Sequence, residues 1–195
     1  MSVKKGDVQK RDAQKPTVLS ALKTRDIAFL GLFVAVSMVL SYVESLIPVY
    51  LGAPGIKPGL ANLFVLLLFM EKRPKEAVAV NLIRIVLSGF LFGNLFSIVY
   101  SLAGAALSMA VMYGMLWMGR FHPFTTSVAG GIAHNIAQLL VALLVLDTDA
   151  MLYYLPVLVL FGGAAGILNG VLAGLLRPYL GRLWQSDERH RLRKH

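Results

Sequence analysis

Six apolar segments, separated by short polar or Gly/Pro-containing stretches, dominate the chain between residues 27 and 176. They cover residues 27–47, 58–70, 77–92, 95–118, 127–146 and 151–176. A helix needs about 20 apolar residues to cross a bilayer, so the pattern predicts membrane helices, of which the second is too short to span alone. The expected fold is an all-α integral membrane protein, a bundle of about six transmembrane helices.

The composition agrees with that fold class and narrows the chemistry. Hydrophobic residues make up 57% of the chain, charged residues 15%, and the mean hydropathy is +0.69. These values exclude an ordinary soluble domain. The chain has no cysteine, which excludes disulfides, thiolate nucleophiles and thiolate metal sites. It also has no GxxxxGK[ST] motif, so any energy source is expected in a partner or a gradient.

The basic residues lie almost wholly on one side of the predicted bundle. All but two of the 19 lysines and arginines fall within the first 25 residues, in the turns at residues 72–75 and 120, or after residue 176. Lys and Arg are in excess in cytoplasmic loops, so both termini are expected in the cytoplasm. The predicted organisation is a basic cytoplasmic tail (1–25), a membrane domain (26–178) and a second basic tail (179–195).

Polar side chains interrupt these apolar segments. A rise of 1.5 Å per residue puts Asn62, Arg84 and His134 roughly 10–12 Å from the predicted inner helix ends, at one level near the midplane. Ionisable groups at that depth cost a few kcal/mol and usually mark a functional site. We expect an outward-facing polar pocket. Its predicted substrate-binding residues are Glu44, Lys57, Asn62, Arg84, Ser88, His134, Asn135 and Gln138.

The segment between the first two predicted helices, residues 48–59, is rich in Pro and Gly. It cannot continue a helix and is too apolar for a simple solvated loop. We expect it to form a lid loop over the pocket, carrying Lys57. A shortened helix beside a broken segment is typical of transporter binding sites, because non-helical backbone at that depth must line a cavity.

Structural alternatives stand beside these functional interpretations. Glu44 could reach the headgroups from an outer helix end. A structural pair between Glu44 and Arg84 is disfavoured, because the helix rise separates them by roughly 13 Å. His134, with its neighbours on the same helix, could simply cross-link helices. No second histidine or carboxylate lies one turn from His134, so a zinc site is disfavoured and no cofactor is expected.

The first predicted helix carries a face of small residues, formed by Ala28, Gly31 and Ala35. Small residues four positions apart allow another helix to approach closely. Packing within the chain is the common use of such a face, and docking of a partner helix is the alternative.

Together these features resemble the substrate-binding S components of energy-coupling factor (ECF) importers. The resemblance is closer to one branch, the Gx transporter family, often labelled heptaprenyl diphosphate synthase component I, and covers about residues 25–176. It is carried by VLSYVESLIP at 39–48, GIKPGLAN at 55–62, Arg84, GxxxG at 89–93, YSLAG at 100–104, AHNxxQ at 133–138 and YYLP at 153–156. The family implies that the small-residue face docks on a transmembrane coupling protein driven by two ATPases.

The sequence therefore favours an importer subunit in the cytoplasmic membrane that captures a small anionic or zwitterionic solute and is not itself an enzyme. The alternative is a non-catalytic membrane subunit linked to heptaprenyl or polyprenyl diphosphate synthesis. A catalytic version is disfavoured, because Asp147 and Asp149 alone cannot supply the clustered carboxylates that hold Mg²⁺ on a diphosphate. A channel is also disfavoured, since the inner half offers little polar lining beyond Asn81 and Asn169.

Overall fold

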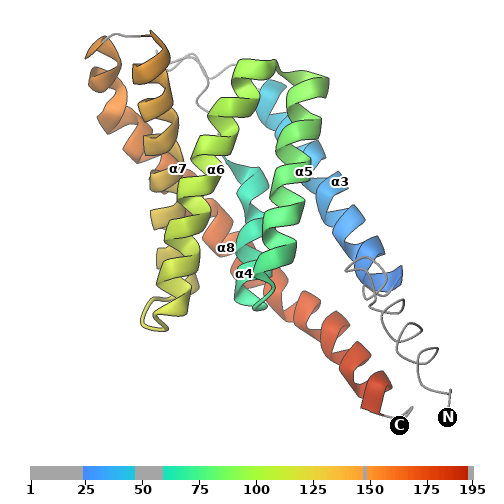
Figure 1. Cartoon of the computed structure of the whole chain (residues 1–195). Helices are drawn as coiled ribbons and strands as arrows, with labels where there is room; N and C mark the ends of the chain where they lie inside the picture. Colours follow the sequence, from blue (N-terminus) through green and yellow to red (C-terminus); the bar gives the residue numbers. More distant parts are fainter. Residues whose placement is uncertain (1–23, 47–58, 147–148, 193–195) are drawn as a thin grey trace, which may run out of the picture.

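A computed structural model describes residues 24–46, 59–146 and 149–192, and these residues form helices and no strand. Six α-helices run up and down the bundle, with two 3₁₀ turns between them (Figure 1). The elements are α3 (Thr24–Leu46), η1 (Leu60–Asn62), α4 (Leu63–Met70), α5 (Pro74–Phe92), α6 (Leu95–Trp117), α7 (Pro123–Leu146), η2 (Asp149–Tyr154) and α8 (Leu155–Leu192). The expected all-α class is confirmed.

Within the part of the chain that the structure describes, four helical stretches are long and apolar enough to cross a membrane. They are Ile27–Leu46, Leu95–Trp117, Pro123–Val145 and Ala150–Gly181. The eight residues of α4 are too few to span, as the hydropathy pattern predicts. In α5 the charged residues Lys75, Glu76 and Arg84 interrupt the apolar run. The four stretches indicate a multi-pass membrane protein.

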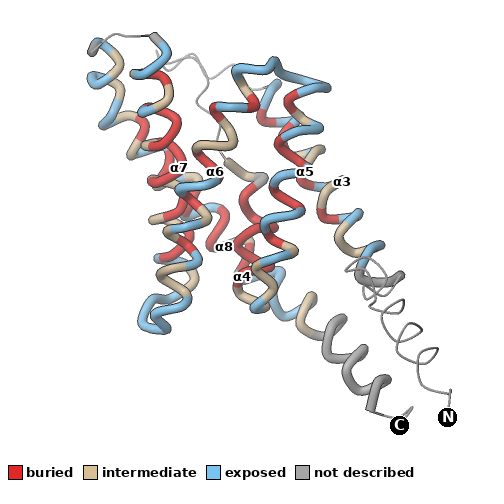
Figure 2. The backbone as a smooth tube through the Cα atoms, in the orientation of Figure 1, coloured by how far each residue is buried: buried red, intermediate tan, exposed pale blue. Residues whose placement is uncertain are grey.

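The short helix α4 forms the core of the bundle. Its sequence, LFVLLLFM, has no polar face, and a helix that is apolar all round is stable only when neighbours cover every side. Residues Leu63 to Phe69 are all buried, and α5, α6, α7 and α8 all contact the helix. Figure 2 shows this burial along α4, in contrast to the long exposed faces of the outer helices. The expectation of a shortened second helix is thus confirmed.

Helices α7 and α8 approach each other through glycine. A Cβ atom added to Gly131 would lie 2.2 Å from the carbonyl oxygen of Gly162, and one added to Gly162 would lie 2.6 Å from that of Gly131. Farther along this contact between α7 and α8, which we call the glycine seam, a Cβ on Gly166 would lie 2.5 Å from Val128 Cα. Contacts this close join backbone to backbone, which only small residues allow. Gly131, Gly162 and Gly166 therefore serve the packing of α7 against α8.

The last helix is longer than its hydropathy predicts. α8 does not end near Leu176 but continues through Pro178 to Leu192. A membrane span ends where the sequence stops being apolar, but the helix itself can continue. Polar residues such as Arg, Gln and Glu are good helix formers in water. Pro178 removes one backbone donor inside the helix, and the chain stays helical on both sides of it.

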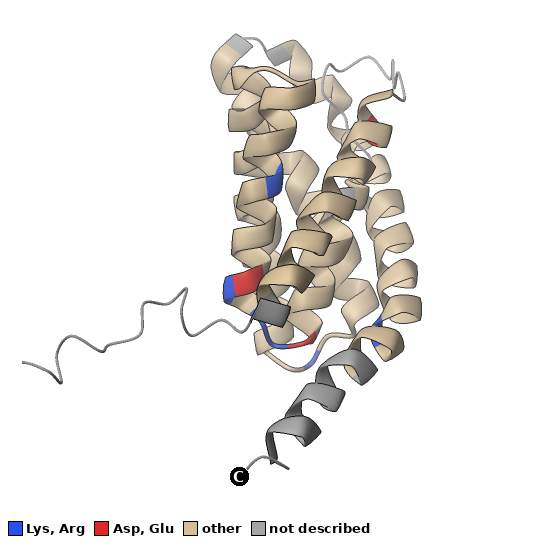
Figure 3. Cartoon of the chain, turned by 90° about the vertical axis from the view of Figure 1, so that its right-hand side faces the viewer, with Lys and Arg blue, Asp and Glu red and all other residues tan. Residues whose placement is uncertain are grey.

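Apart from the buried Glu44 and Arg84, the described Lys, Arg and Glu side chains gather at one end of the bundle (Figure 3). The α4–α5 turn supplies Lys72 and Arg73, and the α6–α7 turn supplies Arg120. Arg177 of α8 donates to Glu71 across 3.3 Å, so α8 is tied to the end of α4. The start of α3 and the end of α8 lie at this same end (Figure 1).

A matched pair of glycine substitutions tests the seam. We expect Gly166→Ala to lower the stability of the detergent-solubilised protein by about 1–3 kcal/mol, because the new methyl group meets backbone that cannot move aside. Gly174→Ala, on the same helix, has no atom within 4 Å of its added Cβ and is expected to be neutral or slightly stabilising. Thermal unfolding of both variants measures the difference, and equal unfolding temperatures would contradict the seam.

Candidate functional site

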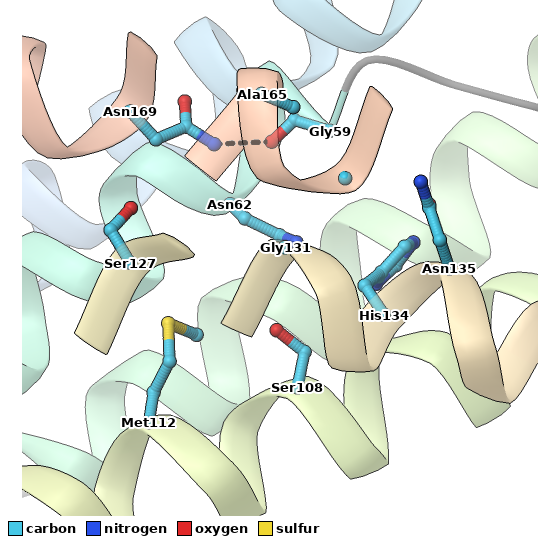
Figure 4. Close-up of a pocket in the computed structure, with 11 residues that line it drawn as sticks. Gly59, Asn62, Ser108, Met112, Ser127, Gly131, His134, Asn135, Ala165 and Asn169 are labelled. Atoms are coloured by element: carbon cyan, nitrogen blue, oxygen red, sulfur yellow. Dashed lines mark hydrogen bonds between the residues drawn. The ribbon is translucent and has the colours of Figure 1, made fainter. Parts of the chain in front are cut away.

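A small cavity lies where η1, α6, α7 and α8 meet, at mid-depth in the bundle (Figure 4). Its volume is about 10 Å³, which is room for about one water molecule. The described residues that line it are Gly59, Asn62, Ser108, Met112, Ser127, Gly131, His134, Asn135, Gly162, Ala165 and Asn169. Hydroxyl, amide and imidazole groups from four elements thus surround one point inside an otherwise apolar bundle.

The cavity is bordered by the turn that begins η1. Gly59 has φ 74° and ψ 24°, a left-handed conformation that suits glycine. Its carbonyl oxygen accepts a hydrogen bond of 3.0 Å from the backbone N–H of Asn62. It also accepts one of 2.7 Å from Nδ2 of Asn169 in α8 (Figure 4). Because that carbonyl can only accept, the orientation of the Asn169 amide is determined, with Nδ2 facing Gly59.

Glu44 holds the same turn from the other side. Its Oε1 accepts a hydrogen bond from the Leu60 backbone N–H, the first donor of the helical segment that continues into α4. A carboxylate is favourable at such a position, since the first backbone donors of a helix have no partner within it. Glu44 is only 4% exposed. It therefore points into the bundle rather than out to the headgroups.

Arg84 belongs to a second polar cluster, between α3 and α5. Its Nε donates to Oδ1 of Asn81 across 3.2 Å, its Nη2 donates to the same oxygen, and its Nη1 donates to Oγ of Ser41 across 3.2 Å. Asn81 also donates to Sδ of Met109 across 3.4 Å. The charge of Glu44, one turn beyond Ser41, attracts the guanidinium without a direct hydrogen bond between them. Arg84 thus joins α5 to α3.

The three polar residues of the AHNxxQ stretch on α7 have different environments. His134 lines the cavity, and its ring packs on Gly104, where an added Cβ would lie 2.8–3.0 Å from the ring atoms. Asn135 also lines the cavity and donates across 2.9 Å to the carbonyl of Leu158, which cross-links α7 and α8. Gln138 is fully buried one turn farther along, and its Oε1 has no partner among the described residues.

The predicted site residues separate into groups. Asn62, His134 and Asn135 meet at the cavity. Glu44 and Arg84 do not line it, and Ser88 is half-buried with its hydroxyl donating across 3.3 Å to Ile85 in its own helix. Lys57 and the predicted lid loop fall outside the described residues. Asn62, Arg84 and His134 were expected at one level, and of these Asn62 and His134 meet at the cavity. Arg84 does not, because the side of α5 that carries it faces α3.

Sequence reasoning missed three polar residues of the lining, Ser108, Ser127 and Asn169. Ser108 lies roughly 14 Å along α6 from its end at Trp117, which is the level predicted for Asn62 and His134. Depth alone could have identified Ser108. Asn169 was expected in the inner half, away from the pocket. Among the described residues, no cluster of three or more potential metal ligands occurs.

The face formed by Ala28, Gly31 and Ala35 is open. All three residues are exposed, and an added Cβ on Gly31 has nothing within 4 Å. Large apolar side chains of α3, including Leu32, Val39 and Leu46, are exposed as well. Within the described structure, the face therefore does not serve packing inside the chain.

The two hydrogen bonds at the η1 turn generate a prediction. We expect Glu44→Ala to leave the partly buried Leu60 N–H without its acceptor, which costs about 1–3 kcal/mol. Hydrogen exchange of the peptide covering η1 and α4 should then be about ten-fold faster. The control is Ser45→Ala, an exposed neighbour whose hydroxyl donates only to Tyr42 in its own helix. Equal exchange in both variants would show that Glu44 does not hold the turn.

Comparison of the sequence and structure with known proteins identifies the family of the chain. No curated protein and no solved structure matches the chain. Residues 33–176, about three quarters of the chain, match the family described as heptaprenyl diphosphate synthase component I. The match extends from α3 to α8, so it includes every element that lines the cavity. The chain belongs to the heptaprenyl diphosphate synthase component I family.

Proposed function

We propose that the chain is the membrane-embedded substrate-binding subunit of an importer of the ECF type, which captures a small polar solute from outside the cell. The observation that carries this proposal is the polar cavity at mid-depth. Ser108 and Asn169 are both lining residues of this cavity. Neither Oγ of Ser108 nor Oδ1 of Asn169 has a hydrogen-bond partner among the described residues. A buried polar atom without a partner costs about 1–3 kcal/mol, so a bound water or a polar ligand is expected to complete its hydrogen bonding.

The cavity as described holds about one water, so a solute would bind in a more open arrangement of the same elements. In this proposal Asn62, His134 and Asn135 supply hydrogen bonds, and Gln138 extends them one turn outward. Arg84 supplies the attraction for an anionic or zwitterionic group. Because Asn81 and Ser41 hold its guanidinium in this structure, contact with a solute would require those hydrogen bonds to rearrange.

The exposed small-residue face of α3 is the proposed docking surface for the coupling protein. ATP hydrolysis would then occur in the ATPase subunits of that module, and the chain itself would carry out no chemistry. The positive-inside rule places the charged end of the bundle in the cytoplasm, with both termini on that side of the cell membrane. In this proposal Lys57, which the sequence predicts in an outer loop, would face the incoming solute, and Glu44 would contact the solute only after releasing the Leu60 N–H.

Native mass spectrometry of the gently purified protein, expressed with its host's membrane proteins, tests this proposal. We expect the intact protein to carry a retained small molecule and to copurify with a coupling protein and ATPases. Loss of the retained molecule in Asn62→Ala, with an unchanged unfolding temperature, would place it at the cavity. A protein that never carries a small molecule, in any preparation that keeps the bundle folded, would contradict the proposal.

The docking surface has its own prediction. We expect Gly31→Leu to reduce copurification of the coupling protein at least ten-fold without changing solute retention, because the side chain fills the close-approach face and touches nothing inside the chain. Gly114→Leu is the control, since Gly114 of α6 also has nothing within 4 Å of an added Cβ. Unchanged copurification of Gly31→Leu would move the docking surface elsewhere.

A second candidate is a non-catalytic membrane subunit of a heptaprenyl diphosphate synthase, which the family's description favours. The same experiment separates the two. Copurification of a soluble prenyl synthase, with no retained small molecule, would support the accessory subunit and overturn the importer.

A further inference from the structure

Among the described residues, two buried serines have a hydroxyl without a hydrogen-bond partner, and these two serines differ in one respect. Ser37 in α3 is 0% exposed and Ser108 in α6 is 1% exposed, and neither hydroxyl has a partner among the described residues. A serine inside a helix can satisfy its hydroxyl on the carbonyl of the preceding turn, and neither side chain does so. Ser108 lines the cavity, whereas Ser37 is not among its described lining residues.

The surroundings of Ser108 keep space open around its hydroxyl. Gly104, Ser108 and Met112 follow one another at every fourth position, so they share one face of α6. Gly104 makes room for the His134 ring, and Met112 packs on Gly130, where an added Cβ would lie 2.5 Å from Met112 Cγ. Between these two contacts, Figure 4 shows the Ser108 hydroxyl pointing up from α6 towards Gly131 and Asn62.

The groups that share the cavity with Ser108 indicate what it binds. The polar side chains of the described lining are those of Asn62, Ser127, His134, Asn135 and Asn169, together with Ser108 itself, and no Lys, Arg, Asp or Glu is among them. Hydroxyl and amide groups both donate and accept hydrogen bonds. An uncharged group that does the same would be matched here, whereas a bare charge would lack a counter-charge within the described lining.

We infer that Ser108 is a substrate-contacting residue, whose hydroxyl binds an uncharged hydrogen-bonding group of the solute such as a hydroxyl, an amide or a ring carbonyl. This inference rests on the proposed function and names the chemistry of the solute at the deep side of the site. Any charged group of the solute then lies away from Ser108.

The first experiment measures access to Ser108 without a known solute. Because the chain has no cysteine, Ser108→Cys and Ser37→Cys each introduce one thiol into an unreactive background. The probe is methanethiosulfonate ethylammonium, applied to membranes, with modification read from the mass of the intact protein. We expect Ser108→Cys to react at least ten-fold faster than Ser37→Cys. Equal rates would overturn the inference, because a solute site must open to water.

The second experiment separates binding from folding. Removing an unpartnered hydroxyl breaks no bond within the described structure, so Ser108→Ala and Ser37→Ala should both keep or raise the unfolding temperature. Ser108→Ala should weaken binding of the retained small molecule about ten-fold, the effect of one lost hydrogen bond, and so lower the fraction of protein that carries it. Ser37→Ala should leave that fraction unchanged.

The outcomes distinguish this inference from the proposed function. A wild-type protein that retains a solute, with equal retention by Ser108→Ala, would overturn the role of Ser108 and leave the importer standing. A wild-type protein that retains no solute would overturn the importer, and the inference would fall with it. A stable Ser108→Ala protein that loses the solute supports both.

Discussion

The structure depends on how the buried start of the short helix satisfies its backbone. A helix that begins inside a membrane-spanning bundle exposes donors and acceptors that lipid cannot satisfy. Glu44 of α3 accepts from the Leu60 N–H, and Asn169 of α8 donates to the Gly59 carbonyl, so two helices far apart in sequence hold the same turn. The apolar α4 has no polar face to determine its depth. Its polar start therefore determines where the core helix lies relative to α3 and α8.

The same turn shares a cavity with the glycine seam. Gly131 and Gly162 bring α7 and α8 into backbone contact, and both residues also line the cavity. One wall of the site is thus made of main chain that cannot yield to a larger side chain. Another part of the lining is the η1 turn, which two side-chain hydrogen bonds hold. Breaking one of these bonds costs about 1–3 kcal/mol while its groups stay buried, which is less than separating two close-packed helices along their length. The lining is stiff at the glycine seam and more readily released at the η1 turn.

Most of the fold was predictable, because apolar segment length and Gly/Pro punctuation determine where membrane helices begin and end. The level of Asn62 and His134 was also predictable from the helix rise, and both line the cavity. The rotation of each helix about its own axis, which decides the neighbour that a side chain faces, was not predictable. Arg84 is at a similar level yet faces Ser41 of α3, because α5 turns that side towards α3. Ser108 was missed for the opposite reason, since a lone serine in an apolar helix gives no sign of which neighbour it faces.

The distribution of charge explains why the cavity can be polar without being ionic. Arg84 is held by Asn81 and Ser41 and attracted by Glu44, so the buried charges compensate each other near α3 and α5. The described cavity lining is left with neutral donors and acceptors, two of which lack partners. Apolar side chains at these positions would make the core more stable unless a bound water or solute completes the hydrogen bonding of these atoms. Their presence at mid-depth favours a function in which a small polar molecule completes the hydrogen bonding of the core.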